Sequence, residues 1–406
     1  MSSEAAGVAR HGRLLIGGVA VGAVSGLASA GFLAALDGVT RVHRQTPTLL
    51  WLLPAAGLAV GLVFHRWGGR AVGGTRLTMA EIDDLRDGVP LRMAPLVLVG
   101  TLMTHLFGGS AGREGTAIQM SAGITDGLGR RLGIVAADRR ILLVAALAGG
   151  FGSVFGVPWA GLVFALEVAP TTRRRRVVAV LPSMAASWIG HLTVGWVGVA
   201  HHRFPRLGAT RLPDLGRLAI GGIAFGLVAW SFVALTDHVR SLFGRWVAWP
   251  PLRPAAGGAA VILLTLAIGT RDYNGLSLPL LDRALDADDV EMWAFAFKAL
   301  LTAVTVGSGL PGGEVTPLFV VGATTGATVA GVIGGPVAVI AGVGMVATFG
   351  AAANASVACV VMGVELFGWD ALAPLVVGCS VARLVSSRRH LYGSTGRSVD
   401  QTAADR

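Results

Sequence analysis

The feature that most constrains this chain is a series of long apolar runs that contain no Asp, Glu, Lys or Arg. These runs span residues 14–36, 48–64, 94–107, 141–166, 177–199, 218–236, 255–270, 299–313, 315–364 and 371–382. A helix needs about 20 residues to cross a bilayer, and several of the runs reach that length. Only 14% of the 406 residues are charged, whereas soluble domains are about a quarter charged. The sequence therefore predicts an all-α integral membrane protein.

Several runs are too short for a simple span or are broken by Gly and Pro. The longest, 315–364, is expected to form two segments that part near Gly334, Gly335 and Pro336. Broken helices persist at membrane depth only where protein buries them or where they line a cavity. No stretch alternates with a period of two, which excludes a membrane β-barrel.

The net charge of +10 first suggests a nucleic-acid partner. The arginines, however, gather in short groups at the ends of the apolar runs, without interleaved aromatic residues for base stacking. These groups are Arg10 with Arg13, Arg130 with Arg131, Arg139 with Arg140, and Arg173 to Arg176. This is the pattern of the positive-inside rule, so we expect a multi-pass protein of the cell membrane that binds no nucleic acid.

The chain also repeats itself. The stretch FGSVFGVPWAGLVFALE (151–167) is echoed by FGAAANASVACVVMGVE (349–365), and GREGT (112–116) by GGEVT (312–316). Repeats of this kind in transporters form two halves that meet around a site near the membrane midplane. We therefore predict a first half in residues 1–200 and a second in residues 201–406.

Glu114 is the first candidate for the site. It lies in GGSAGREGTAIQM, between two apolar runs. A carboxylate at membrane depth costs at least about 2.5–3.5 kcal/mol, so it normally has a partner or a function. The next residues indicate a helix start, where free N–H groups and the helix dipole favour an anion. Either the carboxylate occupies this anion site and leaves when protonated, or it simply pairs with Arg113.

Glu314 repeats this arrangement in GSGLPGGEVTPLF, where Pro317 suits the first turn of a helix. A glycine-rich loop before a helix can also bind phosphate. No Walker lysine follows here, and the segment enters an apolar run, so a nucleotide site is not expected.

The stretch GGSAG (108–112) matches G-x-S-x-G, with His105 nearby, and raises the alternative of an intramembrane serine protease. That motif requires a strand before the serine and a triad placed around it. Both flanks of Ser110 are apolar and helical, so packing or capping is the favoured role and the chain is not expected to be an enzyme. No HExxH motif or Cys/His cluster exists, so neither a metal nor another cofactor is expected.

Four further polar residues have simpler readings. Tyr392 stands in a polar C-terminal segment and is typical of an interfacial or tail residue. Glu167 and Glu365 end apolar helices, which places them at an interface. Lys298 is expected to be structural, by snorkelling or by pairing.

Together, GREGTAIQM, the DRRILLVAALAGGFGSVFGVPWAGLVFALE stretch, GSGLPGGEVTPLFVVGA and TFGAAANASVACVVMGVELFG resemble the CLC anion channels and antiporters. The resemblance covers roughly residues 14–396. It implies a homodimer in which each subunit has its own pore, built as an inverted repeat of many tilted and re-entrant helices. It also implies that this chain, which stops soon after Tyr392, carries no soluble C-terminal regulatory domain.

The resemblance assigns roles to individual residues. Glu114 matches the gating glutamate, which competes with the anion and carries protons. The remaining anion-site residues that it implies are Thr75, Gly313, Glu314, Val315, Thr316 and Tyr392. Tyr392 matches the tyrosine of the central site. The resemblance therefore makes Tyr392 a candidate anion-binding residue, which its position in the sequence alone does not.

Differences within the family point to one branch. Thr116 replaces the proline of GREGP, and GGEVTP replaces the GGxFxP motif of chloride members. Both changes resemble the fluoride/proton antiporter branch, as does Val168 in place of the internal glutamate of chloride antiporters. Thr75 stands where chloride members have Ser and fluoride members have Met or Asn.

The implied function is export of fluoride in exchange for protons. The implied location is a bacterial plasma membrane. The implied partners are fluoride or chloride, protons, the lipid bilayer and a second copy of the chain. The alternative is a chloride channel or chloride/proton antiporter of the same family.

Overall fold

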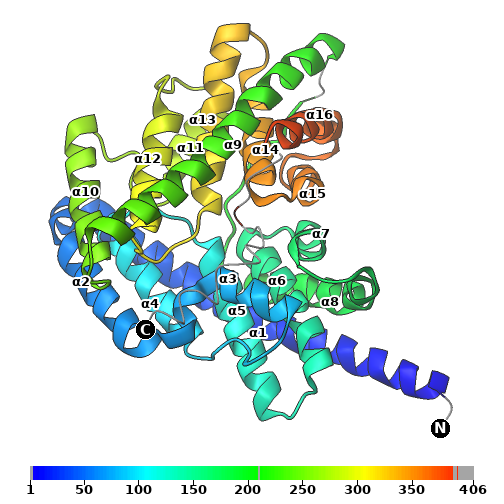
Figure 1. The fold of residues 1–406 in the computed structure, drawn as a ribbon. Coiled ribbons are helices and arrows are strands. Elements are labelled where there is room, and N and C mark those ends of the chain that lie inside the picture. Colours follow the sequence, from blue (N-terminus) through cyan, green and yellow to red (C-terminus); the bar gives the residue numbers. More distant parts are fainter. Residues whose placement is uncertain (1–2, 209–210, 387–390, 392–406) are drawn as a thin grey trace.

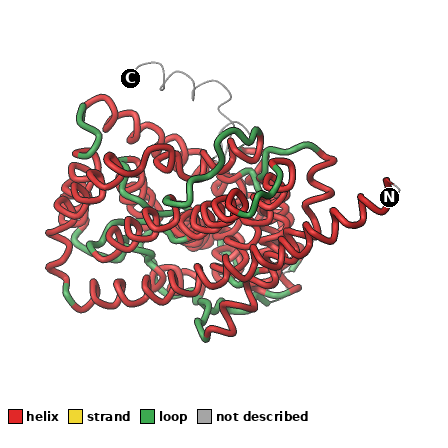
Figure 2. Tube along the Cα trace, turned by 90° about the horizontal axis from the view of Figure 1, so that it is seen from below, coloured by secondary structure: helices red, strands yellow, loops and turns green. Residues whose placement is uncertain are grey.

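Helices make up most of the chain in the computed structural model, which describes residues 3–208, 211–386 and 391 (Figures 1 and 2). The first eight α-helices are α1 (Ser3–Gln45), α2 (Leu53–Val63), α3 (Gly74–Asp83), α4 (Met93–Leu106), α5 (Glu114–Arg131), α6 (Ala136–Phe155), α7 (Pro158–Val168) and α8 (Arg173–Val197). The others are α9 (Leu212–Trp246), α10 (Leu252–Ile268), α11 (Leu278–Leu285), α12 (Ala294–Gly307), α13 (Val315–Ile333), α14 (Val337–Ala353), α15 (Ser356–Phe367) and α16 (Leu372–Val385). No strand occurs in the part that is described, which confirms the all-α prediction.

Five segments of the described chain are long and apolar enough to cross a membrane: Val8–Gln45, Pro47–Asp83, α8, α9 and α13. Several further apolar helices have 10–17 residues and are too short to cross a bilayer unaided. Short helices at that depth need protein around them, because their free backbone ends find no water in lipid. The chain is an integral membrane protein in which short helices are packed among longer membrane-spanning ones.

The breaks fall more often than the sequence predicts. Helices α13 and α14 part at Gly334, as expected, but the run 315–364 forms three helices because Asn354 ends α14 with a φ of 58°. The single run expected at 141–166 likewise divides into α6 and α7. Gly156 takes a φ of 77° there, and Pro158 opens α7. One residue in the left-handed region suffices to stop each helix.

The packing of α1–α8 is matched by that of α9–α16. Helix α1 packs on α6 and α8, and α9 packs on α14 and α16. Gly18 and Gly26 of α1 leave no room for a side chain against the backbone of Pro182 and Gly190, so α1 and α8 run parallel in close contact. In Figure 1 the first set lies below the second. This pairing supports the predicted division near residue 200, which stays a prediction.

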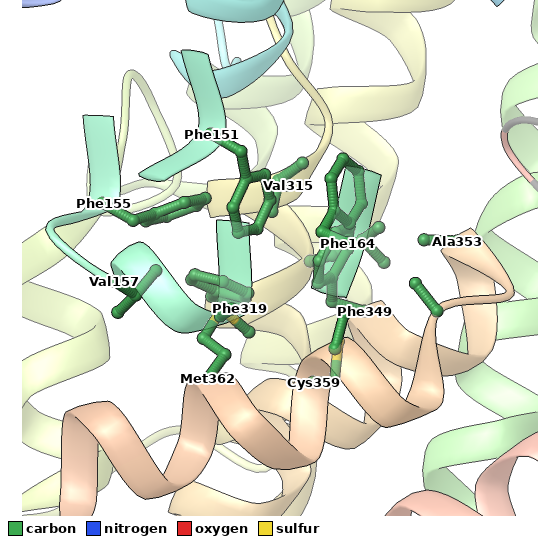
Figure 3. Packing of buried hydrophobic residues seen from close by; sticks show 14 of the residues in the cluster. Phe151, Phe155, Val157, Phe164, Val315, Phe319, Phe349, Ala353, Cys359 and Met362 are labelled. Carbon is green, nitrogen blue, oxygen red and sulfur yellow. The ribbon is translucent and has the colours of Figure 1, made fainter. Parts of the chain in front are cut away.

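The two sets meet in a buried aromatic cluster (Figure 3). Phe151 of α6 stacks on Phe164 of α7 at a ring-centroid distance of 4.2 Å and faces Phe349 of α14 at 6.2 Å. Phe319 of α13 meets Phe349 edge-on at 5.6 Å. Each aromatic pair contributes about 0.5–1.5 kcal/mol beyond its area burial. The cluster therefore fixes how α13 sits relative to α6.

Two glutamates form reciprocal helix caps between the two sets of helices. The carboxylate of Glu365, in α15, accepts hydrogen bonds from the N–H groups of Trp159 (3.0 Å) and Ala160 (2.7 Å) at the start of α7. Glu167, in α7, accepts from Val357 (3.3 Å) and Ala358 (2.8 Å) at the start of α15. Each carboxylate thus caps the helix that carries the other, which the sequence interpretation of interfacial helix ends does not anticipate.

The arginine groups lie on one side. Arg10, near the start of α1, is level with residues 173–176 at the start of the parallel helix α8. It also bonds to Asp138 at the start of α6 (2.8 Å), which Arg139 and Arg140 follow. We assign this side to the cytoplasm by the positive-inside rule, so the C-terminal end of α1 faces outward.

Candidate anion-binding site

Two helix N-termini meet near the centre of the molecule. The loops before α5 and α13 bind each other through a pair of backbone hydrogen bonds, Gly112 N–H to Gly313 O (2.6 Å) and Gly313 N–H to Gly112 O (2.8 Å). Helix α5 begins at Glu114 and α13 at Val315, so both present their positive ends and free N–H groups to the same place. Such a pair of N-termini is suited to bind an anion.

The carboxylate of Glu114 occupies this place. Its side chain is fully buried. It accepts hydrogen bonds from the backbone N–H of Thr316 (3.1 Å), from the Thr316 hydroxyl, and from the Arg113 N–H (3.1 Å). The Nε of Arg113 lies 3.7 Å from its Oε1. The carboxylate therefore uses donors from both helix starts, as a bound anion would, and it also pairs with Arg113.

Of the other predicted site residues, some contact Glu114 and others bond elsewhere. Thr316 contacts it directly. The amide of Gly313 is used by the bridge to Gly112. Thr75, in α3, accepts a hydrogen bond from the side chain of Gln119 in α5 (3.1 Å). Tyr392 falls outside the described residues.

Glu314 contacts a different set of charged residues from Glu114. As the residue before α13, its side chain is 21% exposed, and its Oε1 lies 3.9 Å from Nη2 of Arg240 in α9. Arg240 also bonds to Asp237 (2.9 Å), which lies 3.6 Å from Arg76 in α3. Glu314 thus joins a charged group that includes Arg76, the neighbour of Thr75 in α3.

A buried lysine holds the loop before Glu114. Lys298, in α12, has no exposed surface, so it does not snorkel. Its Nζ bonds to Ser110 Oγ (2.9 Å), Ser277 Oγ (2.9 Å), and the carbonyls of Tyr273 (3.1 Å) and Gly275 (2.8 Å). A buried ammonium without a carboxylate is rare. Here it ties the 108–112 loop to the 273–277 loop.

The same contacts bear on the serine-protease alternative. Ser110 is fully buried, and its Oγ is also hydrogen-bonded to Thr302 (2.9 Å). His105 does not face it: the two ring nitrogens contact the carbonyls of Thr101 (2.9 Å) and Ala111 (3.1 Å). Ser110 therefore has the packing role that the sequence favours.

Gly112→Ala is expected to reduce anion transport at least tenfold. A Cβ at this position would lie 2.7 Å from Oε2 of Glu114 and 2.8 Å from Cδ of Pro317, so the carboxylate or the helix start must move. Misplacement of a reacting group by about 1 Å is enough for losses on the order of 100-fold in catalytic sites. The measurement is anion flux from proteoliposomes. Gly331→Ala, in α13, adds a methyl group where nothing lies within 4 Å and should leave flux unchanged.

Comparison with known proteins identifies the relatives of this fold. The family described as "Voltage gated chloride channel" matches residues 56–387. A chloride/fluoride channel protein of Pseudomonas syringae pv. tomato is 38% identical, over 92% of this chain and 84% of its own length. An H⁺/Cl⁻ exchange transporter of Vibrio cholerae is 27% identical, over 68% of this chain and 62% of its own length.

Among solved structures, a CLC-type fluoride/proton antiporter superposes with a TM-score of 0.89 at 30% sequence identity. The match covers 94% of this chain and 96% of that one. The likeness therefore extends over nearly the whole fold.

Proposed function

Because the chain belongs to the voltage-gated chloride channel (CLC) family of membrane anion channels and antiporters, we propose that it exports fluoride in exchange for protons. The observation that carries this proposal is the Glu114 carboxylate, buried between two helix starts and bound by Thr316. The similarity to a fluoride/proton antiporter at 30% identity and to a chloride/fluoride channel at 38% supports fluoride as the ion.

Glu114 is the gating and proton-carrying residue in this mechanism. An ionised carboxylate and a small anion compete for the same donors, so only one of them is bound at a time. When Glu114 takes up a proton, it loses its charge, and its hydrogen bonds from the Thr316 N–H and hydroxyl become weaker. Fluoride then binds these donors. Glu114 then releases the proton toward the cytoplasm, and its ionised carboxylate returns to the donors and displaces fluoride, so the proton and the fluoride ion move in opposite directions.

Fluoride demands several donors because it is small and strongly hydrated. A site that removes its water must replace those hydrogen bonds, or the ion does not enter. The Thr316 N–H and hydroxyl provide two donors, and we propose the amide of Val315 and the hydroxyls of Thr75 and Tyr392 as others. Gly313 shapes the loop, since its own amide is bonded to Gly112. Glu314 is proposed to share protons or bound HF at the central site.

Thr316→Val is expected to weaken fluoride binding by about 10-fold to 100-fold, because a hydrogen bond to a charged acceptor contributes about 1.5–3 kcal/mol. Valine has nearly the same shape and keeps the backbone N–H. The measurement is the half-saturating fluoride concentration for transport. Thr325→Val is the matched control on α13, because that hydroxyl bonds to its own helix at the Val321 carbonyl (2.7 Å). Equal affinities in the two variants would remove Thr316 from the site.

The function is tested by efflux of fluoride and chloride from proteoliposomes, followed with ion-selective electrodes together with internal pH. The proposal requires fast fluoride efflux, opposite proton movement and little chloride flux. The alternative is chloride transport, which the similarity to the V. cholerae H⁺/Cl⁻ exchange transporter favours. Chloride flux equal to or faster than fluoride flux would establish that alternative and would make Thr75 the counterpart of the serine of chloride members.

We further propose that the protein works as a homodimer in a bacterial plasma membrane. The organisms of the relatives support the compartment. Exposed apolar side chains on α8 and α16, such as Leu181, Leu192, Val376 and Leu384, provide surface that lipid or a second subunit would cover.

A further inference from the structure

The hydroxyl of Thr75 is used differently from several other threonine hydroxyls in the helices of this chain. Those of Thr104, Thr265 and Thr305 donate to the carbonyl four residues earlier, at 3.0, 2.8 and 2.8 Å. The Thr75 oxygen instead accepts a hydrogen bond from Nε2 of Gln119, a residue of α5 (3.1 Å). This hydroxyl is therefore oriented by a neighbouring helix and not by its own.

The contact leaves the proton of the Thr75 hydroxyl free. A hydroxyl has one proton to donate and can accept hydrogen bonds as well. Because Gln119 donates to the Thr75 oxygen, the Thr75 proton points elsewhere, and no acceptor for it occurs among residues 3–208, 211–386 and 391. A hydroxyl that accepts a hydrogen bond also becomes a stronger donor, since linked hydrogen bonds polarise one another. Thr75 is therefore prepared to donate to a bound ion.

Two glycines make room for the amide of Gln119. A Cβ at Gly74, the residue before Thr75, would lie 3.3 Å from both Nε2 and Oε1 of the amide. A Cβ at Gly115, one turn earlier in α5, would lie 3.9 Å from Nε2. Gly74 also has a φ of 53°, which glycine adopts at little cost. The amide therefore packs against the backbones of α3 and α5, which defines its position next to Thr75.

Gln119 belongs to the helix whose start forms the anion-binding site, since α5 begins at Glu114. We propose that Gln119 is a positioning residue that fixes Thr75 as a hydrogen-bond donor and thereby favours fluoride over chloride. This inference rests on the proposed function, in which the Thr75 hydroxyl donates to the ion. Fluoride is the smaller ion and approaches a donor more closely, so a fixed donor attracts it more strongly than chloride.

Gln119→Met tests this role because methionine has nearly the same length and no amide. The half-saturating fluoride concentration for efflux should rise about three- to tenfold, with little change in the maximal rate. The value for chloride should rise less, and an equal rise for the two ions would contradict the effect on selectivity. Gln119→Glu replaces the donor by a group that accepts the Thr75 proton, so it should weaken fluoride binding further. Gln45→Met makes the same change at the exposed end of α1 and should alter none of these values.

A double-mutant cycle with Thr75→Val, which removes the hydroxyl itself, separates positioning from a general structural role. If Gln119 acts through Thr75, Gln119→Met should cause no further loss of affinity in the Thr75→Val protein. Losses that multiply would mean that the two residues act independently, and would overturn the inference. Gln119→Glu supplies a second cycle if Gln119→Met does not fold.

The same cycle distinguishes this inference from the proposed function. Dissociation constants for fluoride and chloride, measured by isothermal titration calorimetry on the purified protein, do not depend on transport. A protein that carries chloride instead of fluoride, with losses of chloride affinity that do not multiply, would refute the proposed function and leave the positioning role of Gln119 standing. Fluoride/proton exchange with losses that multiply would support the proposed function and refute the role of Gln119.

Discussion

Replacing Glu114 with glutamine is expected to abolish proton movement coupled to fluoride flux. The carboxylate is the titratable group that takes donors from both helix starts, through Thr316 and the Arg113 N–H. Glutamine has the same shape but neither gains nor loses a proton, so it cannot carry one through the cycle. Internal pH, recorded during fluoride efflux from proteoliposomes, measures the effect directly.

The matched control is Asp370→Asn, which makes the same carboxylate-to-amide change at an exposed residue more than 200 positions after α5. Its coupled exchange should equal that of the unchanged protein. Coupled exchange that survives in Glu114→Gln would refute the proton-carrying role. In that case the carboxylate would serve only as the partner of Arg113.

The double variant Glu167→Gln, Glu365→Gln is expected to lose stability by several kcal/mol. The carboxylate of Glu167, in α7, accepts two N–H groups at the start of α15, and that of Glu365, in α15, accepts two at the start of α7. Hydrogen bonds to a charged group contribute about 1.5–3 kcal/mol each, and the amide retains only one acceptor oxygen without charge. Thermal unfolding of the purified protein in detergent, followed by tryptophan fluorescence, measures the loss.

Each single variant should show about half of this effect if the two caps act independently. If the double variant loses more stability than the sum of the two single variants, either cap alone can hold the one contact that they share between α7 and α15. Asp370→Asn again provides the control without a helix cap. An unchanged melting temperature in the double variant would contradict a stabilising role for the exchanged glutamates.

The sequence predicts those features that depend on neighbouring residues. The glycines around Glu114 and the apolar run after it are enough to place a carboxylate at a buried helix start, and the GGEVT echo places a second start opposite it. The membrane class follows from the uncharged runs alone. The break at Gly334 is likewise local, because two glycines and a proline interrupt the run there.

Features that join distant parts of the chain were not predictable in this way. The caps of Glu167 and Glu365 connect residues 190 to 206 positions apart, and their acceptors look like ordinary helix ends in the sequence. For Lys298 the sequence leaves both snorkelling and pairing open, and its actual partners lie in the 273–277 loop, more than 20 residues away. The break at Asn354 depends on one residue in a left-handed conformation. Asparagine favours this conformation at helix ends, so this signal was present in the sequence but was overlooked within a long apolar run.

The anion-binding site also has a consequence for synthesis. Gly112 and Glu114 leave the ribosome first, and their partners Gly313 and Thr316 follow roughly 200 residues later. At about 5–20 residues per second this is a delay of about 10–40 s. During that interval the first half of the chain has a carboxylate at membrane depth without the Thr316 donors. Chains that stall there therefore carry a carboxylate whose Thr316 donors have not yet been made.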